Sequence, residues 1–388
     1  MKAVLLAAGG GRRLGPLTER RPKPMVPVGN RPILETVLEA AVGVGVEEVV
    51  LVVGRGSDRI RTHFGDGDEW GVEIRYVVQD HQLGAAHALS QVESVVDGHF
   101  LTLHGDQLVD EELLERLVAR WEETATPTIA AVRSQRPTEY GAVEIEDGTV
   151  RGVSRTPTDD PPFLVNGGAY VFDERVFDVI RGMEETDDGD FGMATALQRL
   201  ADGGGLAAVL HRGAWQDLTY PWDLLTTNAA LVHEHEATGA SDHPGVHDTA
   251  AVSEAVALDE GVSIGPNATL LPGTSLGRNV RVGANAVVSN SIVMAGAHIG
   301  DGAVVHDTVV GEAAAIGSNV TAEGGPADVE IDDRIHRDVG LGGVVADRAT
   351  IRGNATLTPG TVVGCEVVAD SGTVLQGRIA SEETVRRA

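Results

Sequence analysis

Lysine is almost absent from this chain of 388 residues: it occurs only at positions 2 and 23, whereas arginine occurs 28 times. Aspartate and glutamate together number 58, and the formal net charge is -28. A surface of this sign repels nucleic acid and anionic membranes, so we expect neither as a partner. An acid-rich, lysine-poor composition is typical of proteins that work in concentrated salt, where self-repulsion is screened, and it predicts a halophilic protein.

Cysteine occurs once, at position 365, which excludes an intrachain disulfide. Aromatic residues make up only 4% of the chain and glycine accounts for 49 residues, so part of the core must consist of small aliphatic side chains. No apolar run approaches the roughly 20 residues that a membrane span needs, and the short apolar start is followed at once by glycines and arginines. These absences predict a cytoplasmic protein, and the length predicts two domains.

The most informative stretch that is present is LLAAGGGRRLGPLTERRPKP, residues 5–24. A short apolar strand ends in three glycines, which let the backbone turn sharply and present bare N–H groups to an anion. Arg12, Arg13 and Lys23 then supply positive charge around that anion. The spacing is neither that of a P-loop nor GxGxxG. The loop is either a polyphosphate site or a turn with solvated basic residues, and a lysine kept at this point favours the phosphate site.

Up to about residue 230, apolar runs alternate with stretches of helical period. The predicted strands are 3–8, 49–53, 74–78, 100–103 and 129–132, and the predicted helices are 32–44, 57–64, 84–94 and 110–123. This alternation predicts an α/β, Rossmann-like domain with a mostly parallel sheet covered on both faces. Ligands of such folds bind at the carboxyl ends of the strands, where the glycine loop lies.

A hexapeptide pattern follows a polar segment at 233–250, which we interpret as a linker. Aliphatic residues recur about every six positions: Ile264, Leu270, Leu276, Val282, Val288, Ile299, Val305, Val310, Ile316, Val345, Ile351, Leu357 and Val363. This period, with Gly, Asn and Asp between the aliphatic positions, predicts a parallel β-helix. Residues 321–340 break the period and predict an excursion from the coil.

Several motifs now point to one family. The stretch from Leu5 to Glu35, together with VVQDHQLGAAHAL, LTLHGDQLVD and AWQDLTYPWDLL, resembles the sugar-1-phosphate nucleotidyltransferases. The hexapeptide tail makes it most similar to the archaeal two-domain form, which ends in a left-handed β-helix. The resemblance implies a nucleotidyltransferase domain at 1–232, a linker at 233–250 and a left-handed β-helix at 251–388.

The family's reaction joins an NTP and a sugar 1-phosphate into an NDP-sugar and releases pyrophosphate. The resemblance implies that Arg13 binds the β- and γ-phosphates and that Lys23 stabilises charge on the α-phosphate. It also implies that Asp106 and Asp217 hold Mg²⁺ on the phosphates, as hard carboxylates do, and that Asp106 is a catalytic residue. From the residues alone, either aspartate is equally compatible with an ordinary turn.

Other positions match the family's substrate contacts. Those implied for the nucleotide are Ala8, Gly9, Gly11, Gln79, Gly84 and Ala85, with Gln79 at the pyrimidine edge of UTP or dTTP. Those implied for a glucose- or N-acetylglucosamine-type sugar are Gly141, Arg155 and Asn166. Simpler explanations are a tight turn for the glycines and an exposed strand position for the glutamine.

The chain also departs from the family. The lysine of a Glu-Lys-Pro motif, which holds the sugar phosphate, is replaced by Thr156, and Arg155 would start on the other face of a strand. Ala85 stands where a threonine is frequent, and Thr219 replaces a glycine after the second metal aspartate. The tail segment TAEGGPADVEI lacks the histidine expected as general base for acetyl transfer.

Three functions therefore stay open. The first is an Mg²⁺-dependent nucleotidyltransferase. The second is a bifunctional enzyme that also acetylates glucosamine 1-phosphate with acetyl-CoA, and the third is a non-catalytic regulatory or assembly subunit. In each case the resemblance implies a homo-oligomer, a trimer or a multiple of one, formed through the β-helix.

Overall fold

The computed structural model describes residues 1–134, 136, 140–154, 163–183, 192–234 and 243–387. The chain forms two compact units. The first unit consists of residues 1–10, 22–25 and 33–217, and the second of residues 11–21, 26–32 and 218–388. The loop that follows the first strand thus belongs mostly to the second unit, and the two units are described separately.

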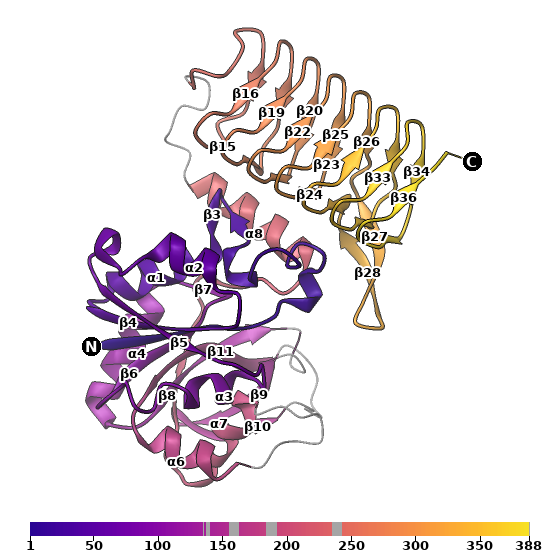
Figure 1. Ribbon diagram of the computed structural model, residues 1–388. Helices are drawn as coiled ribbons and strands as arrows, with labels where there is room; N and C mark the ends of the chain where they lie inside the picture. The colour runs from indigo at the N-terminus through magenta and orange to yellow at the C-terminus, as the bar shows by residue number, and fades with distance from the viewer. Residues whose placement is uncertain (135, 137–139, 155–162, 184–191, 235–242, 388) are drawn as a thin grey trace. The chain divides into compact units, whose positions relative to one another are not determined.

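The first unit is built on a nine-stranded mixed sheet (Figure 1). In spatial order its strands are β5 (Glu73–Val78), β4 (Glu48–Val53), β1 (Lys2–Ala7), β6 (Phe100–His104), β11 (Phe163–Phe172), β8 (Thr128–Ser134), β12 (Ala207–Leu210), β10 (Thr149–Ser154) and β9 (Ala142–Glu146). The first four are mutually parallel, as are β8 and β12. β11 runs antiparallel to both of its neighbours, and β10 and β9 pair antiparallel. All five strands predicted from apolar runs are present.

Helices cover both faces of this sheet. They are α1 (Ile33–Gly43), α2 (Asp58–Phe64), α3 (Ala85–Ser90), α4 (Glu111–Thr124), α6 (Arg175–Arg181) and α7 (Met193–Asp202). α3, α6 and α7 share one apolar core, which contains Phe100, Tyr170 and Phe177. Asp110 precedes α4, and its Oδ1 accepts the backbone N–H of Leu113 at 2.9 Å and so caps the helix. Short 3-10 turns lie at Arg12–Leu14, Lys23–Met25 and Asp68–Trp70.

The second unit contains helix α8 (Pro221–Glu234), the hairpin β2 (Pro27–Val28) and β3 (Arg31–Pro32), and a left-handed parallel β-helix. The β-helix has three sheets of seven parallel strands each, stacked coil upon coil (Figure 1). The first sheet is β14 (Ala251–Val252), β17 (Thr269–Leu270), β20 (Val287–Ser289), β23 (Val304–His306), β26 (Thr321–Ala322), β31 (Thr356–Leu357) and β34 (Val374–Leu375). The second is β15 (Val256–Leu258), β18 (Thr274–Leu276), β21 (Ile292–Val293), β24 (Thr308–Val310), β29 (Gly343–Val345), β32 (Thr361–Val363) and β35 (Arg378–Ile379). The third is β16 (Ser263–Ile264), β19 (Arg281–Val282), β22 (His298–Ile299), β25 (Ala315–Ile316), β30 (Thr350–Ile351), β33 (Val368–Ala369) and β36 (Thr384–Val385).

The predicted hexapeptide aliphatics form the core of these coils. Every one of the thirteen positions named above is buried in a single cluster of valine, isoleucine, leucine and alanine. Asparagines at turns, such as Asn267, Asn285 and Asn319, have φ between 56° and 57°, a left-handed conformation that asparagine tolerates better than most residues. The repeat prediction is confirmed, and it accounts for the scarcity of aromatic residues.

The break in the repeat is an antiparallel hairpin of β27 (Pro326–Ile331) and β28 (Arg334–Gly340). Asp332 and Asp333 form its turn, both with positive φ. The coils resume directly after the hairpin, because β26 pairs with β31 and β24 with β29. The excursion is therefore inserted into the β-helix without disturbing its stacking.

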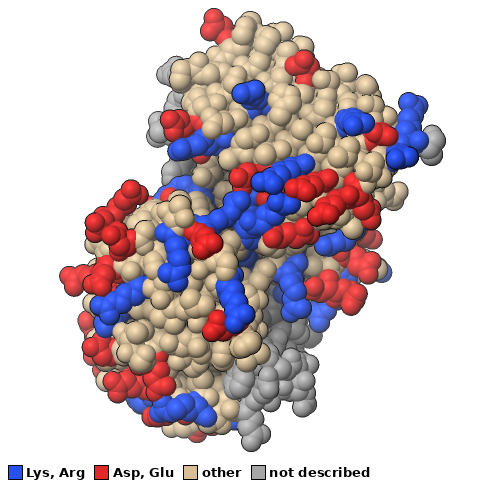
Figure 2. All heavy atoms as spheres, in the orientation of Figure 1, with Lys and Arg blue, Asp and Glu red and all other residues tan. Residues whose placement is uncertain are grey.

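Acidic side chains are spread over the visible face of the first unit, whereas much of the visible β-helix surface carries no charge (Figure 2). Among the described residues, no helix combines the length and the apolar character that crossing a membrane requires.

Candidate active site

The candidate site lies where β1 and β6 end, at the carboxyl edge of the parallel strands. Ala8 is buried after β1, and Gly9 and Gly10 are exposed. After β6, the N–H of Gly105 donates to the carbonyl of Leu6 at 2.9 Å. A Cβ on Gly105 would lie 3.0 Å from that carbonyl oxygen, so only glycine fits without a shift. This close approach places Asp106 directly beyond the end of β1.

Lys23 is buried and bonds to Asp106. Its Nζ donates to Oδ2 of Asp106 at 2.5 Å, and Lys23 is only 8% exposed. Burial by itself would raise the pKa of the Asp106 carboxyl. The charge of Lys23, with smaller contributions from His104 and from hydrogen bonds, outweighs burial and holds this pKa below its ordinary value. Asp106 is therefore an ionised carboxylate at neutral pH.

Asp217 comes from a short ribbon beside Asp106. β13 (Trp215–Asp217) pairs antiparallel with β7 (Gln107–Val109), and the Cα of Asp217 faces that of Gln107. Paired Cα atoms lie at most about 5.5 Å apart and consecutive ones 3.8 Å, so the Cα atoms of Asp106 and Asp217 lie within about 9 Å. Gln107 donates to Oδ1 of Asp217 at 3.2 Å, and the Tyr140 hydroxyl donates to its Oδ2 at 2.8 Å.

His104 lies close to both carboxylates. Burial lowers the pKa of His104, while the charges of Asp106 and Asp217 act in the opposite direction and do not outweigh it. The hydroxyl of Tyr170 lies 3.4 Å from Nε2 of His104, and burial raises the pKa of Tyr170. Two neutral groups, an imidazole and a phenol, thus lie beside the charged ones at neutral pH.

The predicted sugar residues that the structure describes adjoin this cluster. The backbone N–H of Asn166 donates to the carbonyl of Gly141 at 3.0 Å, and its Nδ2 donates to the Tyr170 hydroxyl at 2.8 Å. Trp215 Nε1 donates to the carbonyl of Gly167 at 3.0 Å, and the Tyr140 ring meets Trp215 edge-on, with centroids 5.3 Å apart. Arg155 and Thr156 lie outside the described residues.

The predicted base residues form a second group. Gln79 is 3% exposed, and its Nε2 contacts the carbonyl of Gly84 at 3.2 Å and Nδ1 of His87 at 2.8 Å. Gly84 has φ of 98°, which favours glycine, and precedes α3, whose first residue is Ala85. The structure therefore brings Gln79, Gly84 and Ala85 together at the start of one helix.

The predicted loop residues divide between the two units. Ala8 and Gly9 belong to the first unit, and the Ala8 carbonyl accepts the Nε2–H of Gln82 at 2.7 Å. Gly11, with φ of 62°, and Arg13 belong to the second unit. There the Nε of Arg13 lies 3.1 Å from Oδ2 of Asp332, in the turn of the hairpin, and its guanidinium lies over the ring of Tyr220, 5.7 Å from the centroid.

The described donors fit a divalent ion that is also bound by a substrate. Asp106 and Asp217 are hard oxygen ligands within reach of one another, but no group of three or more His, Cys, Asp or Glu residues in the described part of the chain could enclose a metal. Mg²⁺ is usually held by one or two carboxylates together with substrate phosphates and water. The pair therefore suits Mg²⁺ bound with a nucleotide better than a metal held by protein alone.

The contact residues that were not predicted include Gln82, Gln107 and Tyr140. Gln107 follows Asp106 directly, and Tyr140 precedes Gly141 in EYGAV. Their neighbours in sequence were the only available signal, because each acts through a partner distant in the chain, as Tyr140 does through Asp217, 77 positions away.

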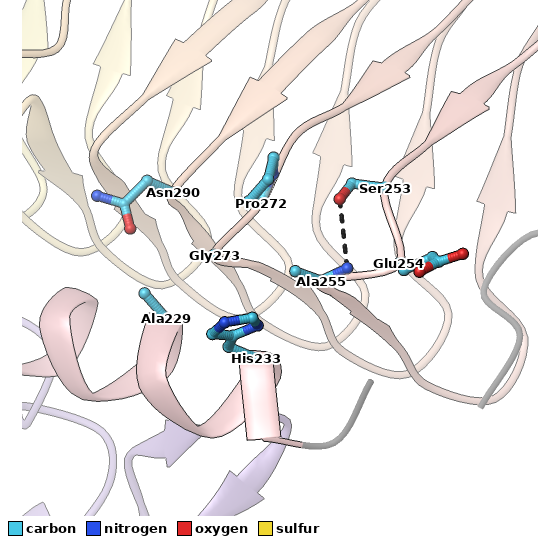
Figure 3. A pocket seen from close by; sticks show the side chains of 8 residues that line it. All are labelled: Ala229, His233, Ser253, Glu254, Ala255, Pro272, Gly273 and Asn290. Atoms are coloured by element: carbon cyan, nitrogen blue, oxygen red, sulfur yellow. Dashed lines mark hydrogen bonds between the residues drawn. The ribbon is translucent and has the colours of Figure 1, made fainter. Parts of the chain in front are cut away.

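Two pockets lie elsewhere. In the second unit, a pocket of about 650 Å³ opens between α8, which contributes Ala229 and His233, and the first turns of the β-helix (Figure 3). None of the predicted site residues lines it. In the first unit, a pocket of about 440 Å³ lies at the ends of β8 and β12 and includes Trp215, the residue that also contacts Tyr140.

The architecture defines the class: an α/β unit with a glycine loop and a carboxylate–lysine cluster, followed by a hexapeptide β-helix. Residues 2–234 match the family model described as nucleotidyl transferase, and residues 252–386 match that of the GMPPB C-terminal domain. The chain belongs to the nucleotidyl transferase family.

Curated relatives support this assignment. The bifunctional protein GlmU of Methanococcus maripaludis is 32% identical over 60% of this chain and 55% of its own length. The low-salt glycan biosynthesis nucleotidyltransferase Agl11 of Haloferax volcanii is 33% identical over 60% of this chain and 67% of its own length. The glucose-1-phosphate thymidylyltransferase of Streptomyces antibioticus is 30% identical over 61% of this chain and 67% of its own length. The chain thus spans only about half the length of the GlmU relative.

A solved structure shares the fold over part of this chain. The putative glucose-1-phosphate thymidylyltransferase of Bacillus anthracis, crystallised with a sucrose, superposes with a TM-score of 0.55. The match covers 59% of this chain and 94% of that one, at 23% identity. At this identity the likeness concerns the fold alone.

Proposed function

We propose that the protein is an Mg²⁺-dependent sugar-1-phosphate nucleotidyltransferase that joins UTP or dTTP to a glucose- or N-acetylglucosamine-type sugar 1-phosphate. One observation carries the proposal: the buried Lys23 ammonium bonds to the Asp106 carboxylate at 2.5 Å, beside the strand that carries Asp217. A buried cation at the edge of the sheet, next to two acidic groups, suits a metal-bound polyphosphate.

In the proposed reaction an oxygen of the sugar phosphate attacks the α-phosphorus in line, and pyrophosphate leaves. No protein nucleophile is required, so catalysis depends on positioning and on neutralising charge. Lys23 binds the α-phosphate, where negative charge grows in the transition state, and Arg13 binds the departing β- and γ-phosphates. Asp106 and Asp217 would hold Mg²⁺, which would supply further charge neutralisation on the phosphates.

Substrate contacts follow from the two groups around this centre. Gln79 binds the edge of the pyrimidine, with Gly84 and Ala85 against the base and Ala8, Gly9 and Gly11 along the nucleotide. Gly141 and Asn166 contact the sugar, and Arg155 supplies charge for its phosphate in place of the lysine that Thr156 replaces. The bonded pair of Gly141 and Asn166 supports a shared role.

The β-helix is proposed to serve assembly into a homo-oligomer, a trimer or a multiple of one, rather than acetyl transfer. The segment TAEGGPADVEI, residues 321–331, contains no histidine to act as general base. The name of the GlmU relatives, "bifunctional protein", keeps acetyl transfer as the alternative. The paired Lys23 and Asp106 argue against a non-catalytic subunit.

The proposed setting is a salt-rich cytoplasm, with small molecules as substrates and no nucleic acid or membrane as partner. The net charge of -28 supports the salt-rich setting, because it requires screening, and it disfavours nucleic acid and anionic membranes as partners.

The test measures pyrophosphate release by purified protein in concentrated KCl with Mg²⁺, a panel of NTPs and a panel of sugar 1-phosphates. We expect release with UTP or dTTP, and its loss in Asp106→Asn, which keeps the size of the side chain but removes its charge. Asp97→Asn is the control, because Asp97 is an exposed partner of Lys2.

A normal rate in Asp106→Asn would refute the role of this carboxylate. Absence of release with every substrate pair, from protein shown by circular dichroism to be folded, would refute the enzymatic function. Acetyl-CoA turnover on glucosamine 1-phosphate, measured in parallel, decides the bifunctional alternative.

A further inference from the structure

Within the second unit, the loop of residues 11–21 lies along one row of turns of the β-helix. This row consists of the turns that follow β21, β24, β29, β32 and β35, at Met294, Glu312, Asp347, Glu366 and Ser381. Successive turns are bonded through their backbones, for example from the N–H of Arg348 to the carbonyl of Glu312 at 2.9 Å and from the N–H of Glu366 to the carbonyl of Asp347 at 3.0 Å. The row is thus a regular, rigid surface.

Arg21 forms the main contact with this row. Its side chain is 4% exposed, and its Nη2 donates to both carboxylate oxygens of Asp347, each at 2.5 Å. The Asp347 side chain is 3% exposed. Arg21 also contacts the sulfur of Met294 at 3.0 Å and a carboxylate oxygen of Glu312 at 3.4 Å. A single arginine therefore spans three consecutive turns.

Neighbouring loop residues contact the next turns of the same row. Arg20 pairs with Glu366 at 2.7 Å, and the hydroxyl of Ser381 donates to Oε2 of Glu19 at 2.7 Å. The Cys365 thiol lies 3.6 Å from the carbonyl oxygen of Pro16. These contacts extend the attachment of the loop from three turns to five.

The ion pair of Arg21 and Asp347 is suited to fixing one arrangement rather than to adding stability. Taking two charges out of water offsets most of their attraction, and the documented use of such pairs is to specify a register. Asp347 is fixed by the β-helix itself, because its Oδ1 also accepts the backbone N–H of Glu312 at 2.8 Å. An arginine bonded to both oxygens of this carboxylate has little freedom.

We propose that Arg21 and Asp347 are positioning residues, which hold the loop so that Arg13, within it, can bind the phosphates of the nucleotide. Arg13 lies within the loop, and only Pro22 separates Arg21 from Lys23 in the chain. The β-helix is then a working part of nucleotidyl transfer as well as an assembly module. The chemistry rests on the proposed function, whereas the attachment of the loop does not.

The test compares the full-length protein with Asp347→Asn in concentrated KCl. We expect amide hydrogens of residues 11–21 to exchange faster in the variant, while those of β1 and of the β-helix core keep their protection. We also expect kcat/KM for the NTP to fall by about 100-fold, since a misplacement of about 1 Å can cost this much. KM for the sugar phosphate should change little.

Asp370→Asn is the matched control, because Asp370 pairs with Arg352 on the β-helix and does not touch the loop. In this variant, the amide exchange of residues 11–21 and kcat/KM for the NTP should equal those of the wild type. Glu366→Gln, which removes the half-exposed partner of Arg20, should loosen the loop more mildly. This second variant decides the question if Asp347→Asn fails to fold.

Unchanged exchange at residues 11–21 in Asp347→Asn, or in Glu366→Gln where that variant decides, would overturn the attachment. A loosened loop with wild-type kcat/KM would overturn the positioning role. If the wild type releases no pyrophosphate with any substrate pair, the proposed function fails, and the exchange measurement still judges the attachment.

Discussion

Lys23 occupies a site that would not readily accommodate arginine. It is 8% exposed and bonds to Asp106, whereas the only other lysine, Lys2, is partly exposed and bonds to Glu48 and Asp97. An ammonium is a compact point charge on a flexible stem, while a guanidinium is a broad planar fork. In a chain that has 28 arginines and only two lysines, the small buried site gives a physical reason for lysine at position 23.

Replacing each lysine with arginine tests this interpretation. We expect Lys23→Arg to lower kcat by about 100-fold or more, the loss typical when one group that stabilises transition-state charge is misplaced. Lys2→Arg should react like the wild type, because Lys2 is the first residue of β1 and lies at the opposite end of that strand from the candidate site. The measurement is pyrophosphate release at saturating substrate, and equal rates for the two variants would contradict it.

Some site residues were predictable because their environment is local. Asp106 follows an apolar strand and a glycine, and Lys23 follows the glycine loop within one stretch of sequence. The bond from Tyr140 to Asp217 joins residues 77 positions apart, and that from Arg21 to Asp347 joins residues 326 positions apart. No period or motif encodes such pairings, because they arise only when distant elements fold together.

At the level of elements, the strands of the sheet differ in how readily their sequence predicts them. β1 and β4 are buried along nearly their whole length and read as unbroken runs. β11 was not predicted, although it lies at the centre of the sheet. Gly167 and Gly168 interrupt it, and its register with β8 shifts between Asn166 and Tyr170. Glycines inside a strand weaken the pattern that identifies it.

The β-helix coils depend on their thin aliphatic core. Ile351 is fully buried in this core, so Ile351→Ala should lower the free energy of unfolding by about 2–5 kcal/mol. Val374 lies in the same tail with 69% of its surface exposed, and Val374→Ala should change the free energy of unfolding by no more than about 0.5 kcal/mol. Guanidinium unfolding, followed by circular dichroism, measures the change in the free energy of unfolding in each variant. Equal changes in the two variants would contradict the description of a single aliphatic core.

At the scale of the whole molecule, charge is the dominant property. Of the charged residues, 58 are acidic and 30 are basic, and several arginines are already paired with carboxylates, as Arg352 is with Asp370. The remaining carboxylates repel one another in the folded state. The screening length falls from about 10 Å at 0.1 M salt to about 3 Å at 1 M, so added salt should relieve this repulsion.

We therefore expect the midpoint of thermal unfolding to rise steeply between 0.1 M and 1 M KCl. Sucrose is the control, because it favours compact states by exclusion from the surface without screening charge. The midpoint should rise more in KCl than in sucrose when the two solutes are compared at concentrations that give the same degree of exclusion from the protein surface. A midpoint that is independent of KCl, or that falls with it, would contradict the halophilic interpretation.

The attachment of residues 11–21 to the row of turns also bears on how such chains can be recombined. A gene fusion that joins one parent's residues 1–217 to another parent's tail keeps the written order of the modules but splits a compact body, because that body includes a short piece from near the start of the chain. Chimaeras that transplant this piece along with the tail should work more often than those that leave it behind. For evolution or for engineering, the unit that must be transferred as a whole consists of separate stretches of the sequence.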